Sequence, residues 1–418
     1  MNRALTIAFL SLLLAGPAAA QPLKQYSLVS LMDGVADFIT DSNTTISLPF
    51  WGFGYTNANP TIVLPGPTIY AKEGDSIHVE MINPSMEGHT IHFHGLDVDQ
   101  ANDGVPHTSD FVLTNQSFTY RFKATHAGNF LYHCHVTTTL HLALGMYGMV
   151  IVYPADSSNR IYTNGPTYDR QHAYLLSDLD SRWNADYTAI GGFTTYAPDL
   201  FLINGKNRSM NYTDTNIQIN GTIGDQHLLR FMNVGYRVNR IIFPSALNAV
   251  VHTSDGRVLD QPYAADTLII YPGERYSVLA EILDETPSFV STDYLDPYRL
   301  RFLGRDYIPV NDTNFTYITP SLEDNMTDTV GVGAAEIAAM PSVLVYPNPA
   351  DNQIWVSTQG ESIEHIEILD MSGRRVRSKH CQYPAERLEL DGLNEGVYIL
   401  NVSLENGKRV SRRCVVVR

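Results

Sequence analysis

Histidines recur in the segment "HTIHFHG", residues 89–95, at a spacing that constrains how the chain can fold there. Successive side chains of a β-strand point to opposite faces of the sheet, so residues two apart share a face. On a single strand, His92 and His94 would therefore share one face and His89 would take the other. One strand can in this way serve two separate sites.

A second segment, "YHCHV" at residues 132–136, repeats the arrangement. His133 and His135 would share a face, while Cys134 points the opposite way. If the two strands are neighbours, His89 and Cys134 meet inside the domain and four imidazoles meet outside it. Packing alone rarely produces such a set, so the pattern predicts metal binding.

The residues after Cys134 complete one of the two sets. His141 supplies a second imidazole, and Met146 within "GMYG" supplies a thioether. A copper electron-transfer site uses two histidines, one cysteine and a methionine bound axially at longer range. Soft thiolate and thioether ligands suit Cu(I), while imidazole suits both oxidation states. A zinc site would not need the methionine. The sequence therefore predicts copper.

Composition favours many short strands joined by turns. Hydrophobic residues make up 44% of the chain and charged residues 17%, with 24 Tyr, 29 Gly and 22 Pro, a mix more typical of sheets than of long surface helices. Runs such as "SIHVEMI" and "NFLYHCHV" alternate with Gly, Pro, Asn and Asp clusters, as in a sandwich or barrel. The predicted fold class is all-β, and 418 residues imply several domains.

Five segments follow from this reading of the chain. The charged, apolar and small-residue stretches at the start are typical of a signal peptide, and the small polar residues before Pro341 are typical of a linker. The predicted segments are a signal peptide at 1–20, a copper-binding β domain at 21–155, a second β domain without copper motifs at 156–320, a linker at 321–341 and a small sandwich at 342–418.

The net charge of −16 disfavours nucleic acid as a partner. No apolar run is long enough to predict a transmembrane segment.

The motifs "HTIHFHG", "DGVPHTS", "AGNFLYHCHV" and "GMYG" resemble the copper-binding motifs of multicopper oxidases, particularly small laccase-like bacterial ones built from two cupredoxin domains. "LLSDLD", "FLINGK", "LRFMNVG" and "YPGERYSVLAE" resemble the copper-free domain of that family. The resemblance covers most of residues 22–320. It implies two tandem cupredoxin-like Greek-key β-sandwiches and an oxidase that takes single electrons from a reductant and reduces dioxygen.

The resemblance also implies ligand roles. His89, Cys134, His141 and Met146 would hold the type 1 blue copper. The catalytic histidines would be His92 at the type 2 copper and His94, His133 and His135 at the type 3 pair.

The chain departs from the family in its number of paired histidines. A complete oxygen-reducing cluster in this family uses four HxH-type pairs, whereas this sequence has two, and the second domain has only the unpaired His172, His227 and His252. An isologous homo-oligomer could restore the cluster, because two first domains would contribute four histidines each. Such a dimer would hold about five copper ions.

Two other functions remain open. A one-copper electron carrier would be blue without consuming oxygen. A nitrite-reductase-like enzyme also combines a blue copper with a histidine-only copper, but in that family a small apolar residue usually follows the copper cysteine, whereas His135 does so here. The reductant is equally open among phenols, metal ions such as Cu(I) or Fe(II), and a protein donor.

The last segment, with "YPNP" and "LNEGVYIL", resembles the C-terminal sorting domain that the type IX secretion machinery of Bacteroidota recognises. It implies passage through the periplasm and then release or attachment at the cell surface. Cys381 and Cys414 both lie in this segment, where we favour a disulfide between them over the alternative of two separate small buried residues. Isolated histidines, such as His78, His107, His126, His172, His227 and His252, are expected in turns or on the surface.

Overall fold

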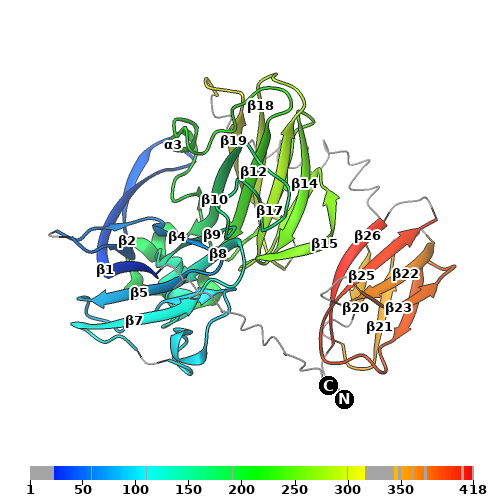
Figure 1. Ribbon diagram of the computed structural model, residues 1–418, viewed down its shortest axis with the longest axis horizontal. Coiled ribbons are helices and arrows are strands. Elements are labelled where there is room, and N and C mark those ends of the chain that lie inside the picture. Colours follow the sequence, from blue (N-terminus) through cyan, green and yellow to red (C-terminus); the bar gives the residue numbers. More distant parts are fainter. Residues whose placement is uncertain are drawn as a thin grey trace, which may run out of the picture.

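The computed structural model describes residues 23–315 except 58, 110, 191 and 299, and residues 343–416 except 347–349, 359–361, 371–373 and 406–408. The predicted signal peptide and linker lie outside these residues. The described chain forms three β-sandwiches, two packed against each other and a third beside them (Figure 1). The predicted all-β fold class is confirmed.

The first sandwich pairs a five-stranded sheet, in the order β3-β2-β1-β5-β7, with a four-stranded sheet, in the order β4-β9-β8-β6. Its elements are β1 (Leu23–Ile39), β2 (Thr45–Tyr55), β3 (Ile62–Val63), β4 (Gly66–Lys72), β5 (Ser76–Asn83), β6 (His92–His94), a 3₁₀ turn (Gln100–Asn102), β7 (Gln116–Lys123), β8 (Gly128–His133), α1 (Thr138–Ala143) and β9 (Tyr147–Tyr153).

Alternation along the strands builds the core of this sandwich. In β5, Ile77, Val79 and Met81 are fully buried, and the residues between them are partly exposed. The same core includes Phe93 and Cys134, so the sulfur of the cysteine lies inside the sandwich.

The second sandwich has a six-stranded sheet, β11-β10-β12-β17-β14-β15, and a four-stranded sheet, β16-β13-β18-β19. Its elements are β10 (Arg170–Leu179), α2 (Ser181–Ala185), two 3₁₀ turns (Tyr187–Ala189 and Phe193–Thr195), β11 (Leu200–Ile203), α3 (Ser209–Tyr212), β12 (Gln226–Asn233), β13 (Val238–Ile242), β14 (Leu247–Ser254), β15 (Arg257–Ala264), β16 (Thr267–Ile270), β17 (Arg275–Ile282), β18 (Ser288–Leu295) and β19 (Phe302–Val310). No helix in the described part of the chain is long and apolar enough to cross a bilayer.

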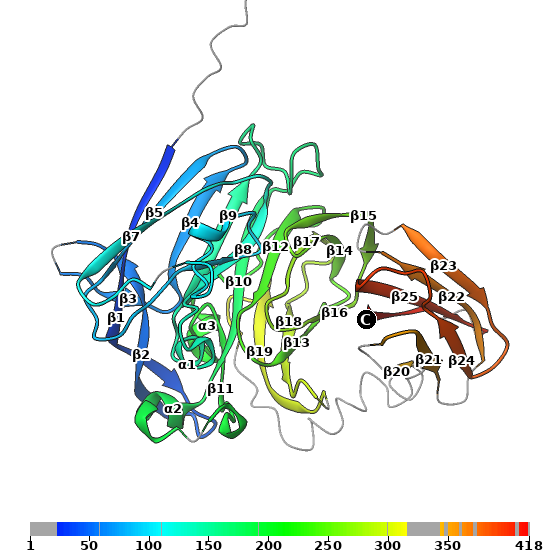
Figure 2. The same cartoon turned by 90° about the horizontal axis from the view of Figure 1, so that it is seen from below.

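Strand β8 lies between the two sandwiches and is buried along its whole length (Figure 2). Phe130 and Tyr132 point into the first core. Leu131 points the other way and packs with Met232 and Val234 of the second sandwich. Burial of one leucine side chain contributes about 1.5–3 kcal/mol to stability. The packing of Leu131 against the second sandwich therefore helps to hold β8, the strand that leads to Cys134, in position.

The third sandwich pairs the sheets β20-β21-β24 and β23-β22-β25-β26. Its strands are β20 (Leu344–Tyr346), β21 (Gln353–Ser357), β22 (Ile363–Leu369), β23 (Arg375–His380), β24 (Ala385–Glu389), β25 (Gly396–Leu404) and β26 (Arg409–Val416).

The predicted disulfide between Cys381 and Cys414 is wrong, because both thiols are free and buried. Cys381 follows the edge strand β23, while Cys414 lies on β26 at the opposite edge of the same sheet. Three strand spacings separate them by about 14 Å, whereas a disulfide needs Cα atoms within about 7 Å.

Candidate metal centre

Three buried side chains from separate elements converge inside the first sandwich. His89 precedes β6, Cys134 follows β8, and His141 lies in α1. The Cys134 sulfur is 3.1 Å from Nδ1 of His141 and 3.7 Å from Nδ1 of His89. All three side chains are 0% exposed.

Backbone contacts hold these residues in place. His89 exchanges two backbone hydrogen bonds with Val112, at 3.1 and 3.0 Å. The Cys134 amide donates to the Met146 carbonyl at 3.0 Å, and the Met146 amide donates to the His141 carbonyl at 3.0 Å. Met146 is fully buried in the same core as Cys134. The structure thus brings all four predicted type 1 residues to one place.

The position of His89 differs from the single strand that the sequence predicts. Only His92, Phe93 and His94 form β6, and His89 makes an isolated bridge to Val112. Residues 90 and 91, which separate the two, belong to no strand, yet His89 still points inward. Two sets therefore remain separate. The inner set is His89, Cys134, His141 and Met146, and the outer set is His92, His94, His133 and His135.

The inner set fits a soft metal ion. Burial lowers the pKa of His89 to about 3 and that of His141 to about 4, so both imidazoles stay neutral and keep a lone pair for a ligand. Burial raises the pKa of the Cys134 thiol to about 11, so a bound cation is needed to hold it as thiolate at neutral pH. Two imidazoles and a thiolate beside a methionine suit copper.

The far side of His141 reaches toward the surface. Its Nε2 lies 3.4 Å from a carboxylate oxygen of Glu87, whose side chain is 46% exposed. The two atoms are close enough for an ion pair, but the lowered pKa of His141 leaves the imidazole neutral, and Nε2 makes no hydrogen bond within the described residues. Glu87 is therefore an exposed negative charge beside the inner set.

The outer set consists of four imidazoles. His92 of β6 is the cross-strand partner of His133 in β8. The ring centroid of His92 lies 5.8 Å from that of His94, 5.2 Å from that of His133 and 5.2 Å from that of His135. One ring nitrogen each of His92, His94 and His133 lie within 4.8 Å of one another.

Neighbouring groups orient three of these rings. His92 Nδ1 lies 2.8 Å from the Asp103 carbonyl oxygen and 3.2 Å from its carboxylate. His133 Nδ1 lies 3.0 Å from the Cys134 carbonyl, and His135 Nδ1 lies 3.2 Å from the Thr138 hydroxyl. Each of the three rings thereby keeps Nε2 for a ligand, an arrangement found where histidines bind metals.

His94 is oriented differently. Its Nδ1 lies 3.4 Å from Nε2 of His133, so Nδ1 is the nitrogen that faces the other rings. Burial lowers the pKa of His94 to about 4 and that of His133 to about 3, and burial also lowers the pKa of His92. These imidazoles are neutral at pH 7 and fit a cation.

The second sandwich approaches this outer set through Gly273 and Arg275. A Cβ on Gly273 would lie 3.0 Å from the His94 ring, and a Cβ on Gly95 would overlap the Arg275 guanidinium. Both glycines have positive φ, of 85° and 87°. These two glycines therefore leave room for Arg275 of the second domain beside His94. The Arg275 side chain is a cation and is only 4% exposed.

Two histidines of the second domain pair with each other, away from this centre. His172 Nε2 lies 3.1 Å from Nδ1 of His227, and their rings stack at 5.4 Å. His227 is fully buried in β12, so its predicted place in a turn or on the surface is wrong.

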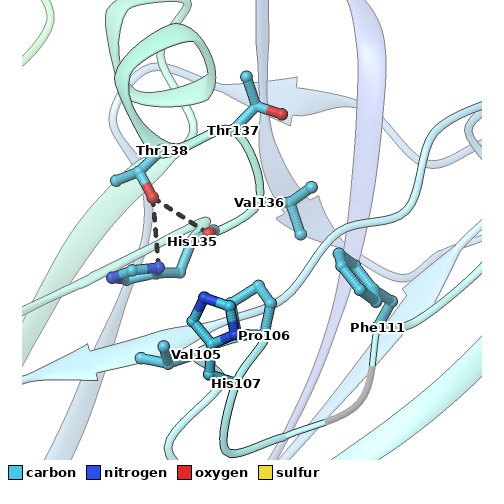
Figure 3. Close-up of a pocket in the computed structure, with 8 residues that line it drawn as sticks. All are labelled: Val105, Pro106, His107, Phe111, His135, Val136, Thr137 and Thr138. Carbon is cyan, nitrogen blue, oxygen red and sulfur yellow. Dashed lines mark hydrogen bonds between the residues drawn. The ribbon is translucent and has the colours of Figure 1, made fainter.

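A pocket of about 400 Å³ opens beside His135 (Figure 3). Val105, Pro106, Phe111 and Val136 make its apolar part, and the exposed His107 projects into it near His135. The outer set is accessible on this side.

Sequence patterns did not identify Glu87, Asp103, Thr138 or Arg275 as site residues. Asp103 lies in the "DGVPHTS" motif, which was the available signal for it. Arg275 lies in "YPGERYSVLAE" of the second domain, where nothing local predicts a contact with His94.

Comparison with known proteins identifies three regions of the chain. Residues 61–157 and 160–293 match two family descriptions that both read multicopper oxidase, and residues 344–417 match a secretion system C-terminal sorting domain.

Curated relatives include Laccase-4 of Trametes villosa, 26% identical over 73% of this chain and 60% of its own length. Laccase-25 of Oryza sativa is 28% identical over 52% of this chain and 38% of its own length. The chain thus spans about 40–60% of the length of these two relatives.

Among solved structures, the blue copper oxidase from Nitrosomonas europaea has a TM-score of 0.57 and 27% identity, covering 69% of this chain and 85% of its own. The multicopper oxidase mgLAC has a TM-score of 0.56 and 25% identity, covering 69% and 86%. The prediction of cupredoxin-like sandwiches is confirmed by these neighbours.

Proposed function

The chain belongs to the multicopper oxidase family, and from this premise we propose that it is a secreted copper-dependent oxidoreductase that passes single electrons from a reductant to dioxygen. The observation that supports this function best is the back-to-back arrangement of the two sets around Cys134. Its sulfur belongs to the inner set, and the residues on either side of it belong to the outer set.

This geometry supports the ligand roles that the family resemblance implies. His89, Cys134, His141 and Met146 would hold the type 1 copper. Bound copper would supply one-electron transfer at the inner set and dioxygen reduction at the outer set.

The protein provides a short path between the two sets. The Cys134 carbonyl accepts a hydrogen bond from His133 Nδ1 at 3.0 Å, in addition to the peptide bonds that join Cys134 to both neighbours. His92 would bind at the type 2 position, and His94, His133 and His135 at the type 3 pair. Asp103 and Thr138 would hold two of these rings in their binding orientation.

A second copy of the chain would complete the outer set. Where the second domain reaches His94, it brings Gly273 and Arg275 rather than an imidazole. The outer side of His135 remains open through its pocket. An isologous dimer would place two first domains face to face, with four histidines from each.

The C-terminal sorting domain supports export of the enzyme by the type IX secretion machinery. Together with the signal peptide expected at residues 1–20, it would direct the chain through the periplasm to release or to the cell surface. In the producing bacterium, deletion of residues 342–418 should leave the protein in the periplasm. Unchanged export of the truncated chain would contradict this assignment.

The alternative function is a one-copper electron carrier, which the incomplete histidine set favours. The full chain, loaded with copper, distinguishes the two by its metal content, visible and EPR spectra and oxygen uptake. An oxidase dimer predicts about 2.5 copper ions per chain and uptake of oxygen. About one copper ion per chain, with blue colour and no uptake, would establish the carrier.

Two substitutions separate the two sets. Cys134→Ser should abolish the blue absorption, and the matched Cys381→Ser should retain it because Cys381 lies in the C-terminal domain. His135→Ala should stop oxygen uptake and keep the blue band. Blue colour in Cys134→Ser, or normal oxygen uptake in His135→Ala, would contradict the assignment.

A further inference from the structure

The outer face of the C-terminal sheet carries a cluster of histidine and carboxylate side chains far along the chain from the copper motifs. A pocket of about 350 Å³ is lined there by Glu364, His365, Glu367, His380, Asn401, Ser403 and Leu404. These residues lie on β22, on β25 and at the end of β23, the strands labelled together in Figure 1.

The register of the sheet explains why the polar groups meet. His365 of β22 is the direct cross-strand partner of His380 in β23 and of Ser403 in β25. Glu367, two residues after His365, points to the same face. The intervening Ile366 and the following Ile368 are buried in the core, so the polar residues occupy the outer face.

The geometry would suit a metal ion once the His380 ring turns toward its neighbours, because the donor atoms of the three side chains do not all lie within 4.8 Å of one another in this structure. Direct cross-strand neighbours have Cβ atoms about 4.5–5.5 Å apart, which lets two imidazoles reach one ion. His365 Nε2 lies 3.9 Å from a Glu367 carboxylate oxygen, and metal bonds of about 2.0 and 2.1 Å can bridge a gap of up to about 4.1 Å. His380 is exposed, so its ring is free to turn toward the same point.

One competing contact exists. Arg375 donates to the same Glu367 oxygen at 2.8 Å, but the arginine side chain is 61% exposed. Exposed ion pairs of this kind contribute little to stability, and the carboxylate has a second oxygen. A divalent ion held by two imidazoles would compete effectively for Glu367.

We propose that His365, His380 and Glu367 form a surface site for a late first-row divalent ion such as Zn²⁺ or Cu²⁺. Imidazole and carboxylate ligands suit these ions, whereas Ca²⁺ and Mg²⁺ prefer sites made wholly of oxygen. The site is independent of the copper centre and of the oxidase function, because none of its ligands belongs to the first two domains.

The test uses the full chain with its copper sites filled, titrated with Zn²⁺ by isothermal calorimetry. His365→Ala and His380→Ala should each bind one Zn²⁺ fewer than the unchanged chain, or bind it at least tenfold more weakly. Glu367→Gln should weaken the same site less. His78→Ala is the matched control, since His78 lies on a strand of the first domain, and it should bind as the unchanged chain does.

Thermal unfolding provides a second measurement. Zn²⁺ should raise the melting temperature of the C-terminal domain, because an ion bound only by the folded state stabilises that state. His365→Ala should lose this shift while melting normally without metal. Equal Zn²⁺ binding and equal shifts in both histidine variants and the unchanged chain would overturn the proposal.

Discussion

The Tyr120 hydroxyl holds the main chain between the inner and outer sets through one hydrogen bond, and Tyr120→Phe tests the effect of losing that bond. The Tyr120 side chain is fully buried, and its hydroxyl oxygen accepts the Ile91 amide at 2.9 Å. Ile91 lies between His89 of the inner set and His92 of the outer set. The substitution leaves the ring in place and deprives one buried amide of its partner.

The expected cost follows from that unsatisfied amide. A buried donor without an acceptor costs about 1–3 kcal/mol, which corresponds to a drop of about 2–12 °C in the melting temperature. Burial raises the pKa of Tyr120 well above its ordinary value, so the hydroxyl is neutral and the loss should not vary between pH 6 and pH 9.

Differential scanning calorimetry of the copper-loaded chain, combined with its visible spectrum, measures both effects. Tyr174→Phe is the matched control, because its buried hydroxyl donates to the Ile217 carbonyl at 2.9 Å within the second domain. Both variants should melt earlier, but only Tyr120→Phe should change the copper spectrum. An unchanged melting temperature and spectrum in Tyr120→Phe would refute the reasoning.

Three further predictions concern single side chains. Asp103→Asn should lower oxygen uptake by about tenfold, which is the low end of the loss seen when the partner of a metal-bound histidine is changed. The loss should be small because the main-chain oxygen of residue 103 still holds His92. Unchanged uptake would contradict this role. Glu87→Gln should raise KM for a cationic reductant roughly fivefold, equivalent to about 1 kcal/mol between exposed charges, and leave a neutral reductant unaffected; equal effects on both would argue against a charge role. Burial lowers the pKa of His172 in the folded chain from the ordinary 6.5 to about 4. Between these two pH values the unfolded chain binds more protons than the folded chain, so the free energy of unfolding should fall as the pH drops from about 6.5 to 4. In urea unfolding, His172→Gln should show a shallower fall over that range, and an identical slope would exclude this origin.

The sequence predicted which histidines and cysteine lie together better than it predicted what surrounds them. Period-two spacing placed His92 and His94 on one face of β6, because the face of a strand depends only on counting residues. His89 lies outside that strand and still points to the other side. The residues that orient the rings were not predictable in this way. Asp103 reaches His92 across a loop, and Arg275 arrives from another domain 181 positions after His94.

The errors have physical reasons of the same kind. His227 looked like a solitary polar residue, yet its strand lies in the middle of a six-stranded sheet, where the partner His172 becomes its neighbour. Two cysteines in one small domain suggested a disulfide, but strand order places them at opposite edges of the sheet. Composition and local spacing carry no information on strand order.

The double burial of β8 also limits how this protein can change. Most strands of a sandwich have an outward row of side chains where substitutions are nearly neutral, and all six residues of β8 are buried. A larger residue at 130 would press on the first core, and one at 131 would press on the second domain. We therefore expect sequence drift among relatives of this chain to be slowest along the strand that delivers Cys134, for reasons of space even before any requirement of copper chemistry.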